Sequence, residues 1–105
     1  MTIPEPSLRL DFGKHRVGPG KIALLEAIIE TGSIRAAASA LGVSYPKSSR
    51  LIKELNETFD GPIVVTRAGG SDRGGASVTP FGERLITAYR AAEVAVQDTV
   101  SGYFS

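Results

Sequence analysis

The fold is decided by the stretch Ser33-Ile-Arg-Ala-Ala-Ala-Ser-Ala-Leu-Gly42-Val-Ser44, which has the pattern of two short helices joined by a tight turn. Its first and last serines are suited to cap a helix, because a hydroxyl accepts a hydrogen bond from a first-turn N–H that has no helical partner. Ala38 leaves room for a second helix to pack closely, and Gly42 accepts the positive φ of the turn without steric cost. These agreeing features predict a helix-turn-helix unit.

The second helix of this unit is expected to begin at the last serine of the stretch and to end near Phe59. It tolerates Pro46, because the first-turn N–H groups of a helix lack helical partners. Ile52 and Leu55 fall on the face that would anchor the helix to a core. We place the whole unit at residues 33–58.

Two elements are predicted before the unit. Apolar and polar residues alternate in part of Leu8–Val17, and this period of two indicates a short strand. From about Pro19 to Thr31 apolar residues recur at helical spacing, and Gly32 is suited to end that helix in the left-handed conformation. The expected apolar stripe comprises Ile22, Leu25, Ile28 and Ile29.

A two-stranded wing and a long helix are predicted after the unit. The β-branched run Ile63–Thr66 predicts a strand, and Ala76–Val78 is suited to return antiparallel to it across a glycine-rich tip. We place this wing at residues 62–79. Thr79 is suited to cap the final helix, which is predicted over residues 80–100.

The order of elements predicts a single domain, residues 1–105, of the α+β class and mainly α. A strand, three helices, a two-stranded wing and a long C-terminal dimerisation helix form the layout of a winged helix-turn-helix. With 42% apolar residues, the 105-residue chain is able to bury a core of its own.

Composition excludes several classes of function. The chain has no cysteine, which excludes disulfides and thiolate metal sites, and its one histidine, His15, is poor evidence for a metal. No apolar run approaches the roughly 20 residues that span a bilayer, and residues 1–10 do not resemble a secretory signal. We therefore expect a cytoplasmic protein. No spacing of hydroxyls and carboxylates supports an enzyme, and we expect no cofactor.

Charge is distributed unevenly along the chain, although the formal net charge is only +1. Between Thr31 and Lys53 the chain contains basic residues and no acidic residue. A local basic stripe on a nearly neutral domain is typical of a nucleic-acid contact. The basic residues of this segment are Arg35, Lys47, Arg50 and Lys53.

These patterns predict double-stranded DNA as the partner, with the second helix of the unit in the major groove. Arg50 is able to form two bonds with a guanine edge, whereas Lys47 and Lys53 are suited to neutralise phosphates. Groove contacts are also expected from Tyr45 and Ser49. The full set of expected DNA-binding residues is Arg35, Ser44, Tyr45, Lys47, Ser49, Arg50 and Lys53, together with Arg67 and Arg73 of the wing.

Other interpretations remain open for the same residues. The basic side chains would also suit an exposed, solvated helix, or a protein–protein contact with an acidic partner. The glycine-rich tip, residues 69–75, lacks the Gly-Lys-Ser/Thr ending of a nucleotide-binding loop, but it would also suit an exposed hairpin with no partner. A small-ligand or metal sensor is the third alternative.

The final helix predicts a homodimer. Its apolar stripe continues through Tyr89, Ala92, Val96 and Val100, beyond what a small domain needs for its own core. A stripe of this kind would otherwise face water. A dimer would also place two recognition helices about one DNA turn apart.

Several segments resemble the N-terminal domain of molybdate-responsive, ModE-type regulators, and the similarity extends roughly over residues 20–96. The helix-turn-helix alone is also similar to LysR-type regulators. The glycine-rich wing is the most specific part. The matching segments are Gly32-Ser33-Ile34, Ala36-Ala37, Leu41-Gly42-Val43-Ser44-Tyr45, Ile52-Lys53-Glu54-Leu55-Asn56, Val65-Thr66-Arg67-Ala68-Gly69-Gly70, Gly74-Gly75-Ala76-Ser77-Val78-Thr79 and Gly82-Glu83-Arg84-Leu85-Ile86.

The resemblance implies a dimeric winged-helix DNA binder in which the N-terminal strand and the last helix contribute to the dimer. It places the recognition helix at residues 44–56 and the wing at residues 67–76. The molybdate-binding part of such regulators is a C-terminal domain, and no oxyanion site of that kind is evident before Ser105. We therefore do not expect this chain to bind molybdate.

Overall fold

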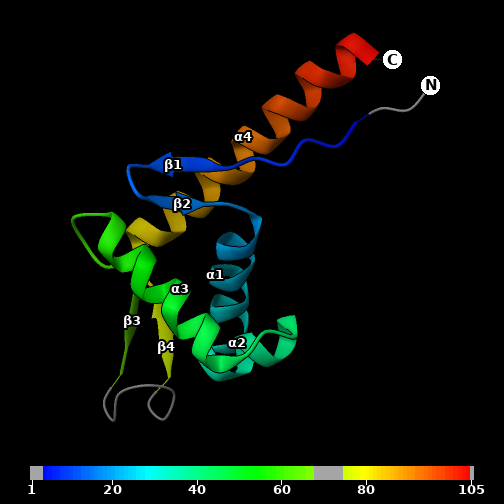
Figure 1. The fold of residues 1–105 in the computed structure, drawn as a ribbon. Helices are drawn as coiled ribbons and strands as arrows, with labels where there is room; N and C mark the ends of the chain where they lie inside the picture. The colour runs from blue at the N-terminus through cyan, green and yellow to red at the C-terminus, as the bar shows by residue number, and fades with distance from the viewer. Residues whose placement is uncertain (1–3, 68–74, 105) are drawn as a thin grey trace.

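A computed structural model of the chain describes residues 4–67 and 75–104 (Figure 1). Helices dominate it, and two small antiparallel hairpins accompany them. The mainly helical α+β prediction is therefore confirmed. In chain order the elements are β1 (Leu10–Phe12), β2 (His15–Val17), α1 (Pro19–Thr31), α2 (Ile34–Leu41), α3 (Tyr45–Thr58), β3 (Val64–Thr66), β4 (Ala76–Val78) and α4 (Pro80–Phe104).

The helix-turn-helix forms as its capping residues predict. The Ser33 hydroxyl accepts a hydrogen bond of 2.8 Å from the N–H of Ala36 and so caps α2. The Ser44 hydroxyl does the same for α3, accepting from the N–H of Lys47 at 3.2 Å. Gly42 lies between the helices with φ of 68°, the left-handed conformation that the turn requires.

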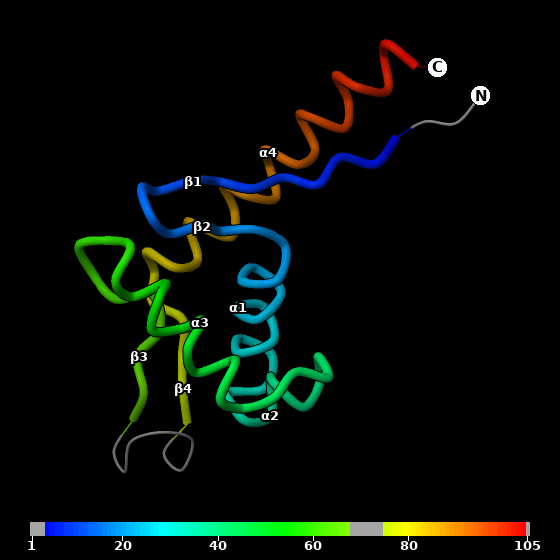
Figure 2. Tube along the Cα trace, viewed as in Figure 1, coloured from blue at the N-terminus to red at the C-terminus, as the bar shows by residue number. Residues whose placement is uncertain are grey.

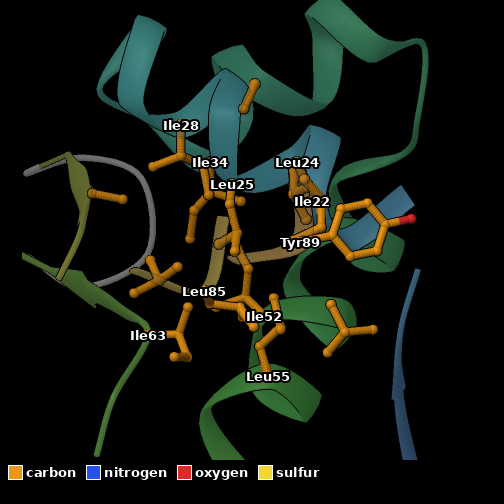
Figure 3. Packing of buried hydrophobic residues seen from close by; sticks show 14 residues of the cluster. Ile22, Leu24, Leu25, Ile28, Ile34, Ile52, Leu55, Ile63, Leu85 and Tyr89 are labelled. Atoms are coloured by element: carbon orange, nitrogen blue, oxygen red, sulfur yellow. The ribbon is translucent and has the colours of Figure 1, made fainter. Parts of the chain in front are cut away.

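The core forms where α1, α2, α3, α4 and the wing meet (Figure 3). Ile22, Leu25 and Ile28 of α1 are buried there, as expected. Ile29 is 50% exposed, so its assignment to the core face was wrong, and Leu24 is buried instead. Ile29 lies at the edge of a shallow pocket beside the wing, where the neighbouring elements do not cover the end of α1.

The N-terminal segment is a hairpin, which corrects the prediction of one strand within residues 8–17. β1 pairs antiparallel with β2, so that Leu10 faces Val17. Gly13, with φ of 65°, reverses the chain between them. Both strands have the same period of two, so alternation does not show where one ends and the next begins. The turn is marked in the sequence by Gly13, which adopts the positive φ that the reversal requires. Edge-to-face contacts attach this hairpin to α3 and α4 through the ring series Phe12–Phe59–Phe81.

The wing strands pair antiparallel, with Val64 facing Val78 and Thr66 facing Ala76. The tip that the sequence assigns to the wing lies largely outside the described residues. At the base of the wing α4 approaches very closely: a Cβ added at Gly82 would lie 2.8 Å from the carbonyl oxygen of Ile63.

The final helix is longer than predicted and ends at Phe104 instead of residue 100. Its C-terminal half projects away from the body of the molecule, with the N-terminal segment beside it (Figures 1 and 2). The buried Tyr89 joins these two segments, because its hydroxyl donates a 2.7 Å hydrogen bond to the carbonyl of Leu8. Within the described residues, no helix has the length and apolar character needed to cross a membrane.

Candidate nucleic-acid interface

The outer face of α3 carries the basic side chains that the sequence singled out. Ser48, Ile52 and Leu55 are buried on the inner face of the helix. This fixes which residues turn away from the core. The exposed residues on the N-terminal part of α3 are Pro46, Lys47, Ser49, Arg50 and Lys53.

The three cations of α3 have no neutralising partner among the residues that the structure describes. Within residues 4–67 and 75–104, neither a hydrogen bond nor an ion pair involves the side chain of Lys47, Arg50 or Lys53. The acids of the helix lie in its C-terminal half. Glu54 pairs with Lys21 at 3.1 Å, and Glu57 lies 3.9 Å from the Nε2 of His15. Residues 45–53 of α3 therefore present positive charge to solvent.

Lys21 fixes the position of α3, and sequence reasoning missed it. This α1 lysine is buried, and its Nζ donates a 2.7 Å hydrogen bond to the carbonyl of Arg16 while it pairs with Glu54. A buried ammonium needs partners of this kind. The pairing joins α1, β2 and α3. The signal in the sequence was a lysine directly before Ile22, at the start of an otherwise apolar helix face.

Arg35 and Tyr45 lie together across the turn between α2 and α3. The Arg35 guanidinium carbon lies 4.6 Å from the centre of the Tyr45 ring, a cation–π arrangement. Tyr45 is half-buried and packs against the hydrophobic core, whereas Arg35 is on the exposed side of α2. The structure thus brings together two predicted contact residues from different helices.

Asn56 joins the recognition helix to the wing. Its Oδ1 accepts hydrogen bonds from the backbone N–H groups of Ile63 and Val64, at 2.8 and 3.1 Å. Its Nδ2 donates to the carbonyl of Val64 at 3.1 Å. The sequence analysis assigned no role to this residue. A polar residue in the last turn of α3, shortly before Gly61 and Pro62, was the available signal.

Of the two arginines predicted to contact DNA from the wing, the structure describes Arg67 and not Arg73. Arg67 directly follows β3, at the end of the wing strands that leads into the tip, and a Cβ on Gly75 would overlap its guanidinium. A backbone hydrogen bond joins β4 to the end of α1 at the same place: the N–H of Ala76 donates to the carbonyl of Gly32 at 2.8 Å. Arg73 lies outside the described residues.

Comparison with known proteins identifies the family. Residues 20–83 match the model of the bacterial regulatory helix-turn-helix proteins of the LysR family. This chain belongs to that family. The matched segment begins in α1 and ends in the first turn of α4, so it contains the whole unit and the wing.

Curated relatives of this LysR-family chain confirm the resemblance to ModE-type regulators. The molybdenum-pterin-binding protein MopB of Rhodobacter capsulatus is 42% identical over 88 residues, which cover 84% of this chain and 33% of MopB. The molybdenum transport protein ModE of Azotobacter vinelandii is 39% identical over 94 residues, 90% of this chain and 34% of the relative. The DNA-binding transcriptional dual regulator ModE of Escherichia coli K12 is 38% identical over 71 residues, 68% of this chain and 27% of the relative. The chain thus spans about a third of these proteins.

Solved structures confirm the winged helix-turn-helix fold. A crystal structure of the CbnR DNA-binding domain with DNA superposes with a TM-score of 0.59 at 23% identity, covering 76% of this chain and 87% of that one. ArgP from Mycobacterium tuberculosis gives a TM-score of 0.57 at 24% identity, covering 79% and 29% respectively. At 23–24% identity, these superpositions establish a shared fold and not a shared function.

Three ionisable groups of the LysR-family domain with shifted pKa values are Glu26 of α1 and Tyr89 and Arg90 of α4. Arg90 donates to Glu26 at 2.6 and 3.0 Å and to Glu93 at 2.7 Å. The hydrogen bonds from Arg90 lower the pKa of the Glu26 carboxyl, and those to both carboxylates raise the pKa of Arg90. Burial raises the pKa of Tyr89. Across the described part of the chain, no three His, Cys, Asp or Glu residues gather as metal ligands would.

Proposed function

We propose that this LysR-family domain binds double-stranded DNA sequence-specifically, as a homodimer, and thereby regulates transcription. In this proposal α3 enters the major groove, and the wing contacts the flanking backbone or minor groove. The domain acts by binding and not by catalysis, in the cytoplasm, where bacterial DNA is accessible.

One observation carries the proposal: the exposed cations Lys47, Arg50 and Lys53 on a helix whose opposite face is anchored in the core. A helix fits the major groove, and a rigidly anchored helix presents its side chains there in a fixed register. Two comparisons support the same interpretation. The E. coli relative is named a DNA-binding transcriptional regulator, and the CbnR domain was crystallised with DNA.

Roles for the individual residues follow from their positions on α3. Arg50 lies in the middle of the exposed face and is proposed to form two hydrogen bonds with a guanine edge. Lys47 and Lys53 flank it along the helix and are proposed to contact phosphates, and Ser49 lies beside it. Arg67 and Arg73 are proposed to contact DNA from the wing.

The homodimer is proposed from the projecting half of α4. Tyr103 and Phe104 are 84% and 46% exposed, and helical spacing places them on the same face of α4 as Val96 and Val100 of the predicted stripe. Burial of such surface against a second copy would be favourable. Charge introduced at Val96 should shift the solution mass towards the monomer, and an unchanged mass would reject this interface.

The names of two of these relatives include molybdenum, but this chain matches only about a third of the length of each relative. It is not proposed as a ligand of this chain.

The test begins with selection of bound fragments from a random pool of duplex DNA. Affinity for the selected site should fall with salt with a log–log slope of about −0.9 per phosphate contacted. Arg50→Ala should cost roughly 1–3 kcal/mol at the selected site and much less on random duplex. An equal loss on both duplexes would reassign Arg50 to the backbone.

Lys14→Ala is the matched control, because Lys14 is an exposed cation in the β1–β2 hairpin, which lies above α3 while the wing extends below it in Figure 1. It should leave affinity unchanged. A purified domain that ignores duplex DNA even in dilute buffer would refute the proposed function. Salt-sensitive binding to an acidic protein instead would favour the protein–protein interpretation.

A further inference from the structure

We propose that Tyr45 is a positioning residue, whose ring holds the Arg35 guanidinium against the DNA backbone beside the major groove. This inference rests on the proposed function and assigns the two residues a joint role. Tyr45 then reads no base through its hydroxyl, in contrast to the groove contact that the sequence suggested. The observation behind it is the 4.6 Å separation of the guanidinium carbon and the ring centre.

The ring is placed by the fold. Tyr45 is the first residue of α3, directly after the Ser44 cap, and it packs against the buried cluster as one of its half-buried members. A side chain with only two χ angles and one face on the core has little freedom to swing into a groove. Its position is therefore set before any ligand arrives.

The Tyr45 ring helps to orient Arg35. Arg35 is the second residue of α2 and is exposed, and stacking on the ring is one interaction that restricts the rotamers of its long side chain. Stacking occupies the face of a guanidinium and not the N–H donors at its edge, and donors of this kind match a phosphate in two-bond geometry. Less conformational entropy is then lost on binding.

The two helices give the pair its location. Arg35 is near the start of α2 and Tyr45 is at the start of α3, so the stack lies at the same end of the unit as Lys47, beside the part of α3 that is proposed to enter the groove. The first turn of α2 contains no acidic residue. That turn therefore adds no repulsion to a phosphate at this edge.

The test uses four variants of the domain: Tyr45→Phe, Tyr45→Leu, Arg35→Gln and the double variant Tyr45→Leu/Arg35→Gln. Binding to a selected duplex and to a random duplex is measured over a range of salt concentrations. Tyr45→Phe keeps the ring and should bind as the wild type does. Arg35→Gln should bind about tenfold more weakly to both duplexes, with a salt slope smaller by about 0.9, because one phosphate contact is lost.

Tyr45→Leu should weaken binding to both duplexes in the same direction as Arg35→Gln. The double variant should be no weaker than Arg35→Gln, because the ring acts only through the arginine. Additive losses, or wild-type binding by Tyr45→Leu, would overturn the inference. Weaker binding of Tyr45→Phe to the selected duplex alone would show that the hydroxyl reads a base, which also overturns it.

A measurement on the wild-type domain avoids the risk that Tyr45→Leu fails to fold. Side-chain protons of Arg35 should be shifted upfield in NMR spectra by the Tyr45 ring current, both in the free domain and in the DNA complex. Loss of that shift on binding DNA would overturn the inference. A wild-type domain that binds no duplex at all would refute the proposed function instead, so the two failures are distinguishable.

Discussion

The side-chain amide of Asn56 pairs with the backbone of Val64 in the way that a neighbouring strand would. It donates to the Val64 carbonyl and accepts from the Val64 N–H, each at 3.1 Å. The same oxygen accepts from the N–H of Ile63 at 2.8 Å. Because Asn56 is in the last turns of α3 and Val64 begins β3, one side chain sets the wing relative to the recognition helix.

Asn56→Ala should lower the free energy of unfolding by about 1–3 kcal/mol, because three backbone groups in a partly buried site lose their partner. Urea denaturation measures this. Asn56→Asp is the matched control: its carboxylate still accepts from both N–H groups but cannot donate to the Val64 carbonyl, so its loss should be smaller. Equal losses in the two variants would contradict the role assigned to the Asn56 oxygen.

Local chemistry made much of the fold predictable. Ser33, Gly42 and Ser44 form caps and a turn from interactions within a few residues, and the structure has each of them as predicted. The N-terminal hairpin was not predictable from alternation, because both strands have the same period and only Gly13 marks the reversal. The end of α4 was also misplaced, because the helix continues through Gly102 to Phe104.

The candidate site was predictable only in part. Exposure of Lys47 and Arg50 follows from helical periodicity, because the apolar face of α3 fixes the opposite one. The contacts of Lys21 and Asn56 join segments that are distant along the chain, and periodicity contains no information about them. The stack of Arg35 on Tyr45 depends on the angle between two helices, which local patterns do not determine.

Gly82→Ala should destabilise the domain strongly. An added Cβ would lie 2.6 Å from a side-chain carbon of Val78 and 2.8 Å from the Ile63 carbonyl oxygen, so α4 would have to move off the wing. Overpacking of this kind costs typically 1–3 kcal/mol. Thermal unfolding measures the change.

Gly102→Ala is the control for the same helix, because an added Cβ there has no neighbour within 4 Å. It should stabilise α4 by up to about 1 kcal/mol, since alanine is the better helix former. Loss of stability in both variants would indicate that α4 does not tolerate alanine for a reason other than the close contact between Gly82 and Ile63.

Ser48→Ala should make the domain more stable. The Ser48 hydroxyl is fully buried on the inner face of α3 and has no hydrogen-bond partner within the described structure. Burial of an unpaired hydroxyl costs about 1–3 kcal/mol by mutational measures, and part of that should be recovered. Ser49→Ala, on the exposed neighbour, gains only helix propensity and should have the smaller effect in urea denaturation. A loss of stability in Ser48→Ala would show that the hydroxyl has a partner, such as a buried water.

The ion pair between Glu26 and Arg90 should make stability depend on pH in the acid range. Hydrogen bonds from Arg90 lower the pKa of Glu26 in the folded protein. Its stabilising contribution is therefore fully present above the unfolded value of about 4.3 and is lost as the pH falls through the lowered folded value. Both side chains are about 40% exposed, so the contribution at neutral pH should be about 1 kcal/mol or less.

Glu26→Gln should accordingly be less stable than the wild type at pH 7, and the difference should shrink as the pH falls below about 4.3, where the wild-type carboxyl becomes neutral as well. Urea denaturation at a series of pH values measures both curves. Glu30→Gln provides the matched control, because Glu30 is an exposed residue of the same helix and is not one of the two carboxylates, Glu26 and Glu93, that pair with Arg90. A difference between Glu26→Gln and the wild type that stays constant from pH 7 into the acid range would mean that shape and hydrogen bonding, and not the charge of Glu26, join α1 to α4.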